Sequence, residues 1–146
     1  MKKILLPTDG SENAHRAGEY AIAEADLGAD IIVLYVIDID YLNALPQQDL
    51  RKKLENGLKK EGEKEIQEFK QKLEDTQCEG HCKNVNLITM IKEGKPADVI
   101  LKTIDEEGID QVIMGKSGKH GIEKLILGST ADRVVRGAKV PVNVIS

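Results

Sequence analysis

The residues best suited to bind a ligand or take part in a reaction lie between positions 114 and 130, in the sequence MGKSGKHGIEKLILGST. This segment begins with Gly115-Lys116-Ser117, which looks like the end of a phosphate-binding P-loop. A Walker A sequence has a glycine, four residues and then Gly-Lys-Ser/Thr, but that first position is Asp110 here. Further glycines also keep the chain in a loop, where a P-loop would open directly into a helix. Both the spacing and the context therefore exclude a P-loop.

The glycines of this segment do not match the dinucleotide-binding fingerprint either. Gly115, Gly118 and Gly121 are each three positions apart, whereas that fingerprint is Gly-x-Gly-x-x-Gly. The remaining interpretation is a glycine-rich loop that closes over an anion, since glycine lets the backbone approach without interference from a Cβ atom.

The far end of the segment, Gly128-Ser129-Thr130, is typical of the start of a helix. A helix N-terminus offers unpaired backbone N–H groups and the positive end of the helix dipole. Ser129 and Thr130 add hydroxyl donors. A serine at such a position is usually only an N-cap, but the preceding glycine loop makes phosphate binding the better interpretation.

A second cluster of reactive side chains is Cys78, His81 and Cys82, in the sequence CEGHC. A structural zinc site needs four ligands, usually as two separated pairs. His15 and His120 are the other histidines, and neither has a neighbouring ligand. We therefore favour a polar surface turn over a metal site, and nothing in the sequence indicates a disulfide.

Five short apolar runs predict buried strands, at residues 2–7, 31–37, 85–91, 109–114 and 140–145. Helical patterns lie between them, at residues 12–27, 48–75, 96–107 and 129–136. Ser11 is a suitable N-cap, and Gly28, Gly108 and Gly137 are suitable helix ends. This alternation predicts a single α/β domain with a doubly wound, five-stranded parallel sheet covered by helices on both faces.

The unusual part of the pattern is an insert between residues 38 and 84. Its first part, DIDYLNALPQQ, is predicted to be a loop, and a long charged helix follows. The helix carries one apolar stripe, made of Leu50, Leu54, Leu58, Ile66, Phe69 and Leu73. We interpret it as a solvated crossover helix with one face in the core, in preference to a surface for a partner.

In an open parallel sheet, ligands bind beyond the carboxyl ends of the strands, where the strand order reverses. Three predicted segments satisfy that description: residues 7–11 after the first strand, residues 36–38 at the end of the second, and residues 115–128 after the fourth. We expect the candidate site to form where these three segments meet.

Composition sets further limits. The chain has 146 residues, of which 40% are hydrophobic and only 3% aromatic, so one core built from aliphatic side chains is expected. The 21 basic residues are interspersed among 25 acidic ones, which does not suggest the basic face of a nucleic-acid-binding protein. No apolar run approaches the about 20 residues that span a bilayer. The apolar run before Pro7 is too short for a signal peptide, so a cytoplasmic protein is expected.

The pattern Gly115-x2-Gly118-x9-Gly128-Ser129 resembles the ATP-binding motif of the universal stress protein family. KILLPTDGSENA resembles the opening strand and turn of that family, VLYVID its second strand and EGKPADVIL the turn into its third helix. LGSTADRVVRGAKVPVNVIS resembles its last helix and strand. The resemblance covers residues 1–146 except the insert, and implies a Rossmann-like fold of the adenine nucleotide alpha hydrolase type.

The resemblance also implies roles for matching residues, with ATP as the ligand and Mg²⁺ or Mn²⁺ as ions that bridge its phosphates. Asp9 matches an acidic residue near the nucleoside, Val36 a backbone contact to adenine, and Gly115 a position beside the ribose. The predicted nucleotide-binding residues are Pro7, Thr8, Asp9, Val36, Gly115, Gly118, Gly128, Ser129 and Thr130. Thr130 is added from helix geometry alone.

Lys116 and Lys119 depart from the usual residues of the family. Either they strengthen phosphate binding or they face solvent, and the sequence leaves both open. The function that the resemblance implies is a nucleotide-dependent regulatory module of the stress response.

The sequence leaves two alternative functions open. The alternatives are a slow ATP-hydrolysing or phosphotransfer enzyme and a nucleotide-independent dimeric scaffold. No catalytic residue is predicted, because no Ser-His-Asp set is present, and TDGSEN lacks the Ser-Gly-Gly-x-Asp-Ser loop of ATP pyrophosphatases. A flavin-dependent module is disfavoured by the scarcity of aromatic residues. The apolar last strand, from Val140 to Ile145, is expected at a sheet edge, where it predicts a homodimer.

Overall fold

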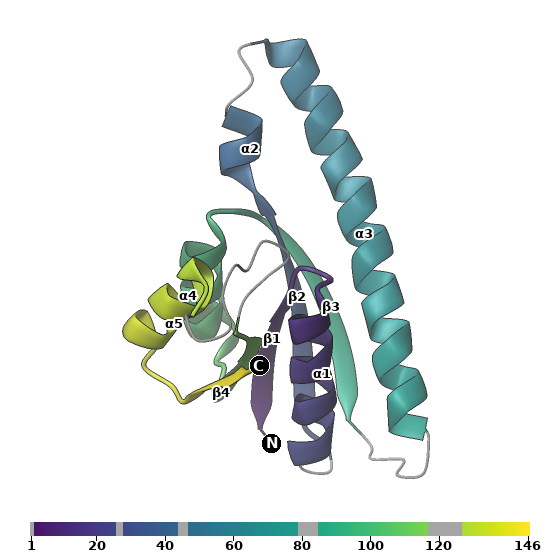
Figure 1. Cartoon of the computed structure of the whole chain (residues 1–146), viewed down its shortest axis with the longest axis vertical. Coiled ribbons are helices and arrows are strands. Elements are labelled where there is room, and N and C mark those ends of the chain that lie inside the picture. The colour runs from purple at the N-terminus through teal and green to yellow at the C-terminus, as the bar shows by residue number, and fades with distance from the viewer. Residues whose placement is uncertain (1, 26–27, 44–46, 79–84, 117–126) are drawn as a thin grey trace.

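The computed structural model describes residues 2–25, 28–43, 47–78, 85–116 and 127–146. Its centre is a five-stranded sheet in the order β3-β2-β1-β4-β5, with every pairing parallel (Figure 1). The strands are β1 (Lys3–Thr8), β2 (Asp30–Asp38), β3 (Asn86–Gly94), β4 (Gln111–Gly115) and β5 (Val142–Ile145). The predicted fold class is confirmed.

Helices cover both faces of this sheet (Figure 1). They are α1 (Glu12–Glu24), α3 (Gln48–Cys78), α4 (Pro96–Glu107) and α5 (Ser129–Gly137), whereas the short helix α2 (Ile39–Asn43) lies beyond the carboxyl end of β2. Buried side chains of α1 and α3 share one core with one face of the sheet, and those of α4 and α5 share a second core with the other face. Strand β1 shows the alternation, since Ile4 and Leu6 enter the first core and Leu5 enters the second.

Local sequence signals explain three of the helix ends, whereas the C-caps of α1 and α5 are Ala25 and Ala138 and not the predicted Gly28 and Gly137. The Ser11 side chain accepts a hydrogen bond from the backbone N–H of Ala14, as predicted for an N-cap. Helix α4 begins at Pro96 and ends at Gly108, which adopts the left-handed conformation with φ 62°. Both signals are local, so they can be read without knowing what the helices pack against.

Several element boundaries differ from the prediction, among them the end of β3, which reaches Gly94 instead of residue 91. Helix α1 ends at Glu24 instead of residue 27, because Ala25 leaves the helix in an extended conformation with its methyl group buried. The segment predicted as a loop after β2 contains the short helix α2. Strand β5 begins at Val142 instead of residue 140, since Pro141 has no N–H to donate to a sheet.

Helix α3 is longer than the sheet that it covers. It runs from Gln48 to Cys78, three residues beyond the predicted end, and its first part projects past the carboxyl ends of the strands (Figure 1). Lys59 of α3 reaches the edge of the sheet, where its ammonium group lies 3.3 Å from Glu93 of β3. Above this level α3 also lies near α2.

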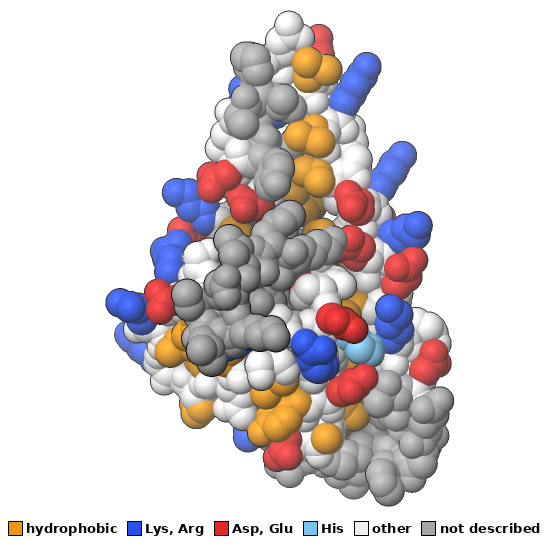
Figure 2. Space-filling model, in the orientation of Figure 1, with side chains coloured by type: hydrophobic (Ala, Val, Ile, Leu, Met, Phe, Trp, Pro, Cys, Tyr) orange, Lys and Arg blue, Asp and Glu red, His pale blue; other side chains and the backbone are white. Residues whose placement is uncertain are grey.

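A row of hydrophobic side chains follows the projecting part of α3 (Figure 2). Leu50 in this part is 49% exposed. Within the described residues, no helix is both long enough and apolar enough to cross a membrane.

Candidate nucleotide-binding site

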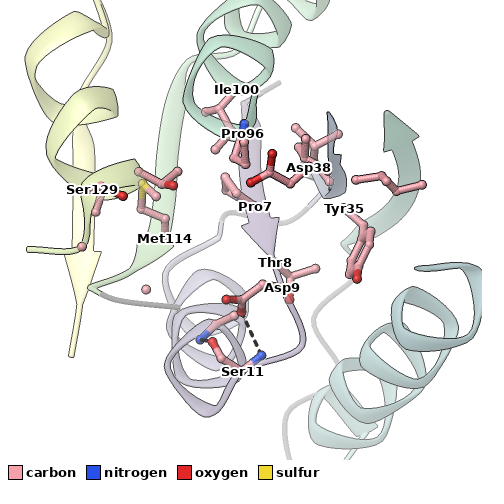
Figure 3. A pocket seen from close by; sticks show the side chains of 18 of the residues that line it. Pro7, Thr8, Asp9, Ser11, Tyr35, Asp38, Pro96, Ile100, Met114 and Ser129 are labelled. Atoms are coloured by element: carbon pink, nitrogen blue, oxygen red, sulfur yellow. Dashed lines mark hydrogen bonds between the residues drawn. The ribbon is translucent and has the colours of Figure 1, made fainter. Parts of the chain in front are cut away.

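A cavity of about 420 Å³ opens at the carboxyl ends of β1, β2 and β4 (Figure 3). Strand β1 is hydrogen-bonded to β2 on one side and to β4 on the other, so the strand order reverses direction at β1. Such a switch point is where open parallel sheets bind ligands. The three segments that the sequence placed together, after β1, at the end of β2 and after β4, all contribute lining residues.

The turn after β1 is held by its own side chains. The Thr8 hydroxyl accepts a hydrogen bond from the Gly10 N–H at 3.1 Å, and Asp9 accepts one from the Ser11 N–H at 2.9 Å. Ser11 then caps α1. Each bond joins a side chain to backbone two or three residues further on, so the conformation of this turn is fixed before any ligand binds.

The end of β2 supplies the wall on the opposite side of β1. Val36 packs toward the α4–α5 core and Tyr35 toward the α1–α3 core, so the cavity extends over both faces of the sheet edge. Burial raises the pKa of the Tyr35 hydroxyl far above its usual value, and a hydrogen bond to Glu65 of α3 adds to the effect. Tyr35 therefore stays protonated at physiological pH.

The β4–α5 side of the cavity combines close backbone packing with a helix N-terminus. A Cβ atom at Gly115 would lie 2.9 Å from backbone and side-chain atoms of Asn13, so glycine allows β4 to pass close to the start of α1. The Lys116 backbone joins two elements, since its N–H donates to Ile145 and its carbonyl accepts from Gly128. Gly128 is the N-cap of α5, so Ser129 is the first helical residue.

The charges of the cavity are separated. Asp9 and Asp38 come from the turn after β1 and the end of β2. Lys116 follows β4, and its carbonyl accepts a hydrogen bond from the Gly128 N–H at the start of α5. Figure 3 shows Asp38 on one side of Pro7 and Ser129 on the other. A ligand with hydroxyl or amino donors at one end and negative charge at the other matches this arrangement.

Most of the predicted site residues line the cavity. These are Pro7, Thr8, Asp9, Val36, Gly115, Gly128, Ser129 and Thr130. Gly118 and Lys119 lie outside the described residues. The contacts that each residue makes with a nucleotide remain a prediction, because lining a cavity does not by itself assign a role.

Other lining residues were not among the predicted ones. They include Leu58 of α3, Pro96 and Ile100 of α4, Met114 of β4 and Ala131 of α5. The position of α4 after β3 could have indicated Pro96, since its helix also starts at the carboxyl edge of the sheet. Leu58 had no such signal, because it belongs to the insert and its contact depends on how α3 is oriented.

No group of three or more His, Cys, Asp or Glu side chains that could hold a metal ion is present in the part of the chain that the structure describes. Cys78 is the last residue of α3, and residues 79–84, which include His81 and Cys82, lie outside the described residues. His15 takes part in different contacts, with Glu19 at 3.0 Å and edge-on against Phe69.

The parallel sheet, the paired cores and a cavity at the switch point define a doubly wound α/β protein with a ligand site at the carboxyl edge of its strands. The family model described as "Universal stress protein family" matches residues 1–146. The chain therefore belongs to the universal stress protein family.

Two relatives from the archaeon Methanocaldococcus jannaschii support the assignment. The universal stress protein MJ0531 is 33% identical over 99% of this chain and 81% of its own length. The solved structure of a second relative, MJ0577, superimposes with a TM-score of 0.84 at 32% identity and covers 99% of this chain and 94% of that chain.

Two more distant structures share the fold and contain nucleotides. A universal stress protein family protein from Arabidopsis thaliana, with AMP bound, has a TM-score of 0.66 at 19% identity. It covers 99% of this chain and 91% of that chain. A universal stress protein in complex with cAMP has a TM-score of 0.60 at 20% identity and covers 99% of this chain and 96% of that chain.

Proposed function

We propose that this chain is an ATP-binding universal stress protein that acts as a nucleotide-dependent regulatory module in the stress response. The observation that carries the proposal is the cavity at the switch point, which collects the turn after β1, the end of β2 and the N-terminus of α5. Its carboxylates suit the donors of a nucleoside, and its helix N-terminus suits phosphate.

The proposed roles follow from the separation of the carboxylates from the N-terminus of α5 in the cavity. Asp9 interacts with the nucleoside, the Val36 backbone with adenine, and Gly115 lies beside the ribose. The α5 end of the cavity, with Gly128, Ser129 and Thr130, receives the phosphates, and Gly118 in the preceding loop helps to enclose them. Because Gly128 takes the N-cap position of α5, Ser129 is not required as the N-cap.

The two nucleotide-bound structures support adenine nucleotides as the ligand class. Both are below 25% identity to this chain, so their support is for what the fold can hold. ATP, in preference to AMP, rests on the family motif and on the positive groups at the α5 end. These are the backbone N–H groups of the first helical turn and Lys116.

A divalent cation would be held mainly by the phosphates. The described residues lack a cluster of three potential ligands, and Mg²⁺ usually binds through substrate phosphates and one or two carboxylates. Asp9 and Asp38 are the carboxylates of the described cavity lining. We assign no catalytic residue, and expect hydrolysis of ATP to be slow if it occurs.

We further propose a homodimer formed through β5, in the cytoplasm. Among the strands of the described residues β5 is an edge of the sheet, where a partner strand could pair with its outer side. The four-residue strand is shorter than predicted, so fewer main-chain bonds can form across such an interface. Light scattering at micromolar concentration tests the proposal, and a monomer alone would contradict it.

The nucleotide is best identified by denaturing the purified protein and analysing released small molecules by mass spectrometry. Calorimetric titration with ATP then gives the affinity of the emptied protein. We expect the double variant Gly118→Val and Gly128→Val to lose binding, since Cβ atoms obstruct the approach of phosphate to the backbone. Gly57→Val is the matched control, because a Cβ atom there meets nothing within 4 Å. Unchanged affinity in the double variant would remove the site assignment.

A further inference from the structure

Helix α3 meets the cavity in two ways, directly through one of its own side chains and indirectly through a side chain of β2. Leu58 of α3 lines the cavity directly, and Tyr35 of β2 lines it while packing against α3 on its other side. Figure 3 shows Tyr35 pointing from β2 toward α3. A contact between the insert and the ligand site therefore exists, although α3 follows neither β1 nor β4.

The contact between Tyr35 and α3 depends on a glycine. A Cβ atom added at Gly62 would lie 2.9 Å from Tyr35 Cε1 and 3.0 Å from Cδ1, closer than Cβ atoms normally approach other heavy atoms. Gly62 is buried despite lying on a largely exposed helix. The tyrosine ring is thus seated against the bare backbone of α3.

The hydroxyl end of the ring is held by the same helix. Burial raises the pKa of this hydroxyl, and Glu65, one turn after Gly62, lies close enough to raise it further through its charge and a hydrogen bond. Nearby, Lys59 bridges Glu55 of α3 at 3.2 Å and Glu93 of β3 at 3.3 Å. These contacts join α3 to the sheet at the level of the cavity, and the packing of Tyr35 against Gly62 is the buried one among them.

The Tyr35 backbone cannot follow a movement of α3. It is paired with Thr8 of β1 on one side and with Ile91 of β3 on the other, inside a parallel sheet. The ring lies between α3 on one side and the cavity on the other. We therefore expect a shift of α3 to change the wall of the cavity, and an occupied cavity to restrain the ring and α3 with it.

We propose that Tyr35 is a positioning residue that couples nucleotide binding to the seating of helix α3. The inference rests on the proposed function, because it takes the cavity as the nucleotide site. Through this coupling, binding of an adenine nucleotide stabilises α3 at residues 58–66, where the projecting part of the helix joins the body of the molecule. Conversely, a change in the seating of α3 alters nucleotide affinity.

The first test compares two glycine substitutions in the same helix. Gly62→Ala pushes on Tyr35, and we expect it to weaken ATP binding about tenfold, the effect of a modest overpacking strain on one wall. Gly57→Ala adds the same methyl group where nothing lies within 4 Å, and its affinity should stay within about twofold of the original. Circular dichroism and thermal unfolding establish that both variants are folded.

A double-variant cycle separates positioning from a general loosening of the helix. Tyr35→Val removes the ring, so adding Gly62→Ala to it should cause no further loss of ATP affinity. If Gly62→Ala weakens binding equally in both backgrounds, its effect does not pass through Tyr35 and the proposal is overturned. Equal ATP affinity of Gly62→Ala and Gly57→Ala would overturn it as well.

Hydrogen exchange on the unmodified protein provides a measurement that needs no variant. Saturating ATP should slow amide exchange at residues 58–66 as well as at the start of α5. Protection at α5 with unchanged exchange in α3 would leave the proposed function standing and overturn the coupling. If the unmodified protein binds no adenine nucleotide, the proposed function fails and the coupling fails with it.

Discussion

The two halves of helix α3 carry the same apolar repeat but meet different surroundings. In the second half, Ile66, Phe69 and Leu73 are at most 4% exposed and pack against α1 and the sheet. In the first half, Leu50 is 49% exposed, because the helix has passed the edge of the sheet. An amphipathic stripe therefore defines which face of a helix is apolar, whereas the length of the neighbouring elements decides how much of that face is buried.

The boundary between the halves lies at the candidate site. Leu58 of α3 lines the cavity, Gly62 and Glu65 lie against its tyrosine wall, and Lys59 bridges to β3. The same short stretch thus ends the buried half of the helix and forms part of the ligand pocket. Substitutions placed on either side of this stretch test whether the halves differ as described.

The largest expected effect is on folding stability in the buried half. Leu73→Ala should lower the free energy of unfolding by about 2–5 kcal/mol, because Leu73 is fully buried and the neighbouring Gly18 and other core groups cannot fill the cavity left behind. Leu50→Ala is the matched change in the projecting half, with an expected loss of about 0.5 kcal/mol or less. Urea unfolding measures both, and similar losses would show that the halves are equally packed.

A smaller effect is expected from glycine-to-alanine substitutions on the two sides of Leu58. Gly57→Ala should raise the free energy of unfolding by about 0.5–1 kcal/mol, since alanine favours the helix and the added methyl group faces open space. At Gly62 the same propensity gain is opposed by contact with Tyr35, so its variant should be the less stable of the two. Equal stabilisation at both positions would contradict the close packing of Tyr35 on α3.

The next effect is confined to alkaline pH. Burial raises the pKa of Tyr35 in the folded protein, with Glu65 as the second cause, so the neutral phenol is favoured by folding. The resulting stability is fully present below the unfolded pKa of about 10 and is lost as pH rises above it. As the pH rises from neutral to above about 10, the Tyr35→Phe variant should therefore lose less stability than the unmodified protein. Parallel stability curves for the two proteins would show that the phenol is not held as described.

The smallest effect is expected at Lys59. Its pKa is raised by hydrogen bonds to Glu55 and Glu93 and by their charges, but the group is exposed and its ion pairs are screened by salt. Lys59→Gln should change stability little, and the difference should shrink further in high salt. A large, salt-independent loss would mean that this bridge, and not the apolar packing, fixes α3 on the sheet.

The fold was predictable because its signals are local and repeated. Strands apolar on both faces, a serine before α1, and a proline and a glycine at the ends of α4 each follow from short-range chemistry. The start of β5 was predicted two residues early, since the apolar pattern of VPVNVI hides the missing N–H of Pro141. The position at which α3 extends beyond the edge of the sheet depends on tertiary structure, and no residue in the helix indicates it.

The candidate site was predictable to the extent that it follows strand ends. Asp9, Val36, Gly115 and Ser129 all lie beside the carboxyl edge of the sheet, which the alternation of strands and helices already implied. The structure adds a packing reason for Gly115, whose backbone lies against Asn13. The α3 contribution could not be predicted, because the contact of Gly62 with Tyr35 joins residues far apart in the sequence.

The most direct test of the nucleotide site is the change in backbone amide NMR signals when ATP is added to the intact protein. We expect shifts that saturate and that concentrate at the turn after β1, the end of β2 and the first turn of α5, with smaller shifts around Gly62. Absence of saturable shifts at millimolar ATP, or shifts centred on the β5 edge, would contradict a nucleotide site at the carboxyl ends of the strands.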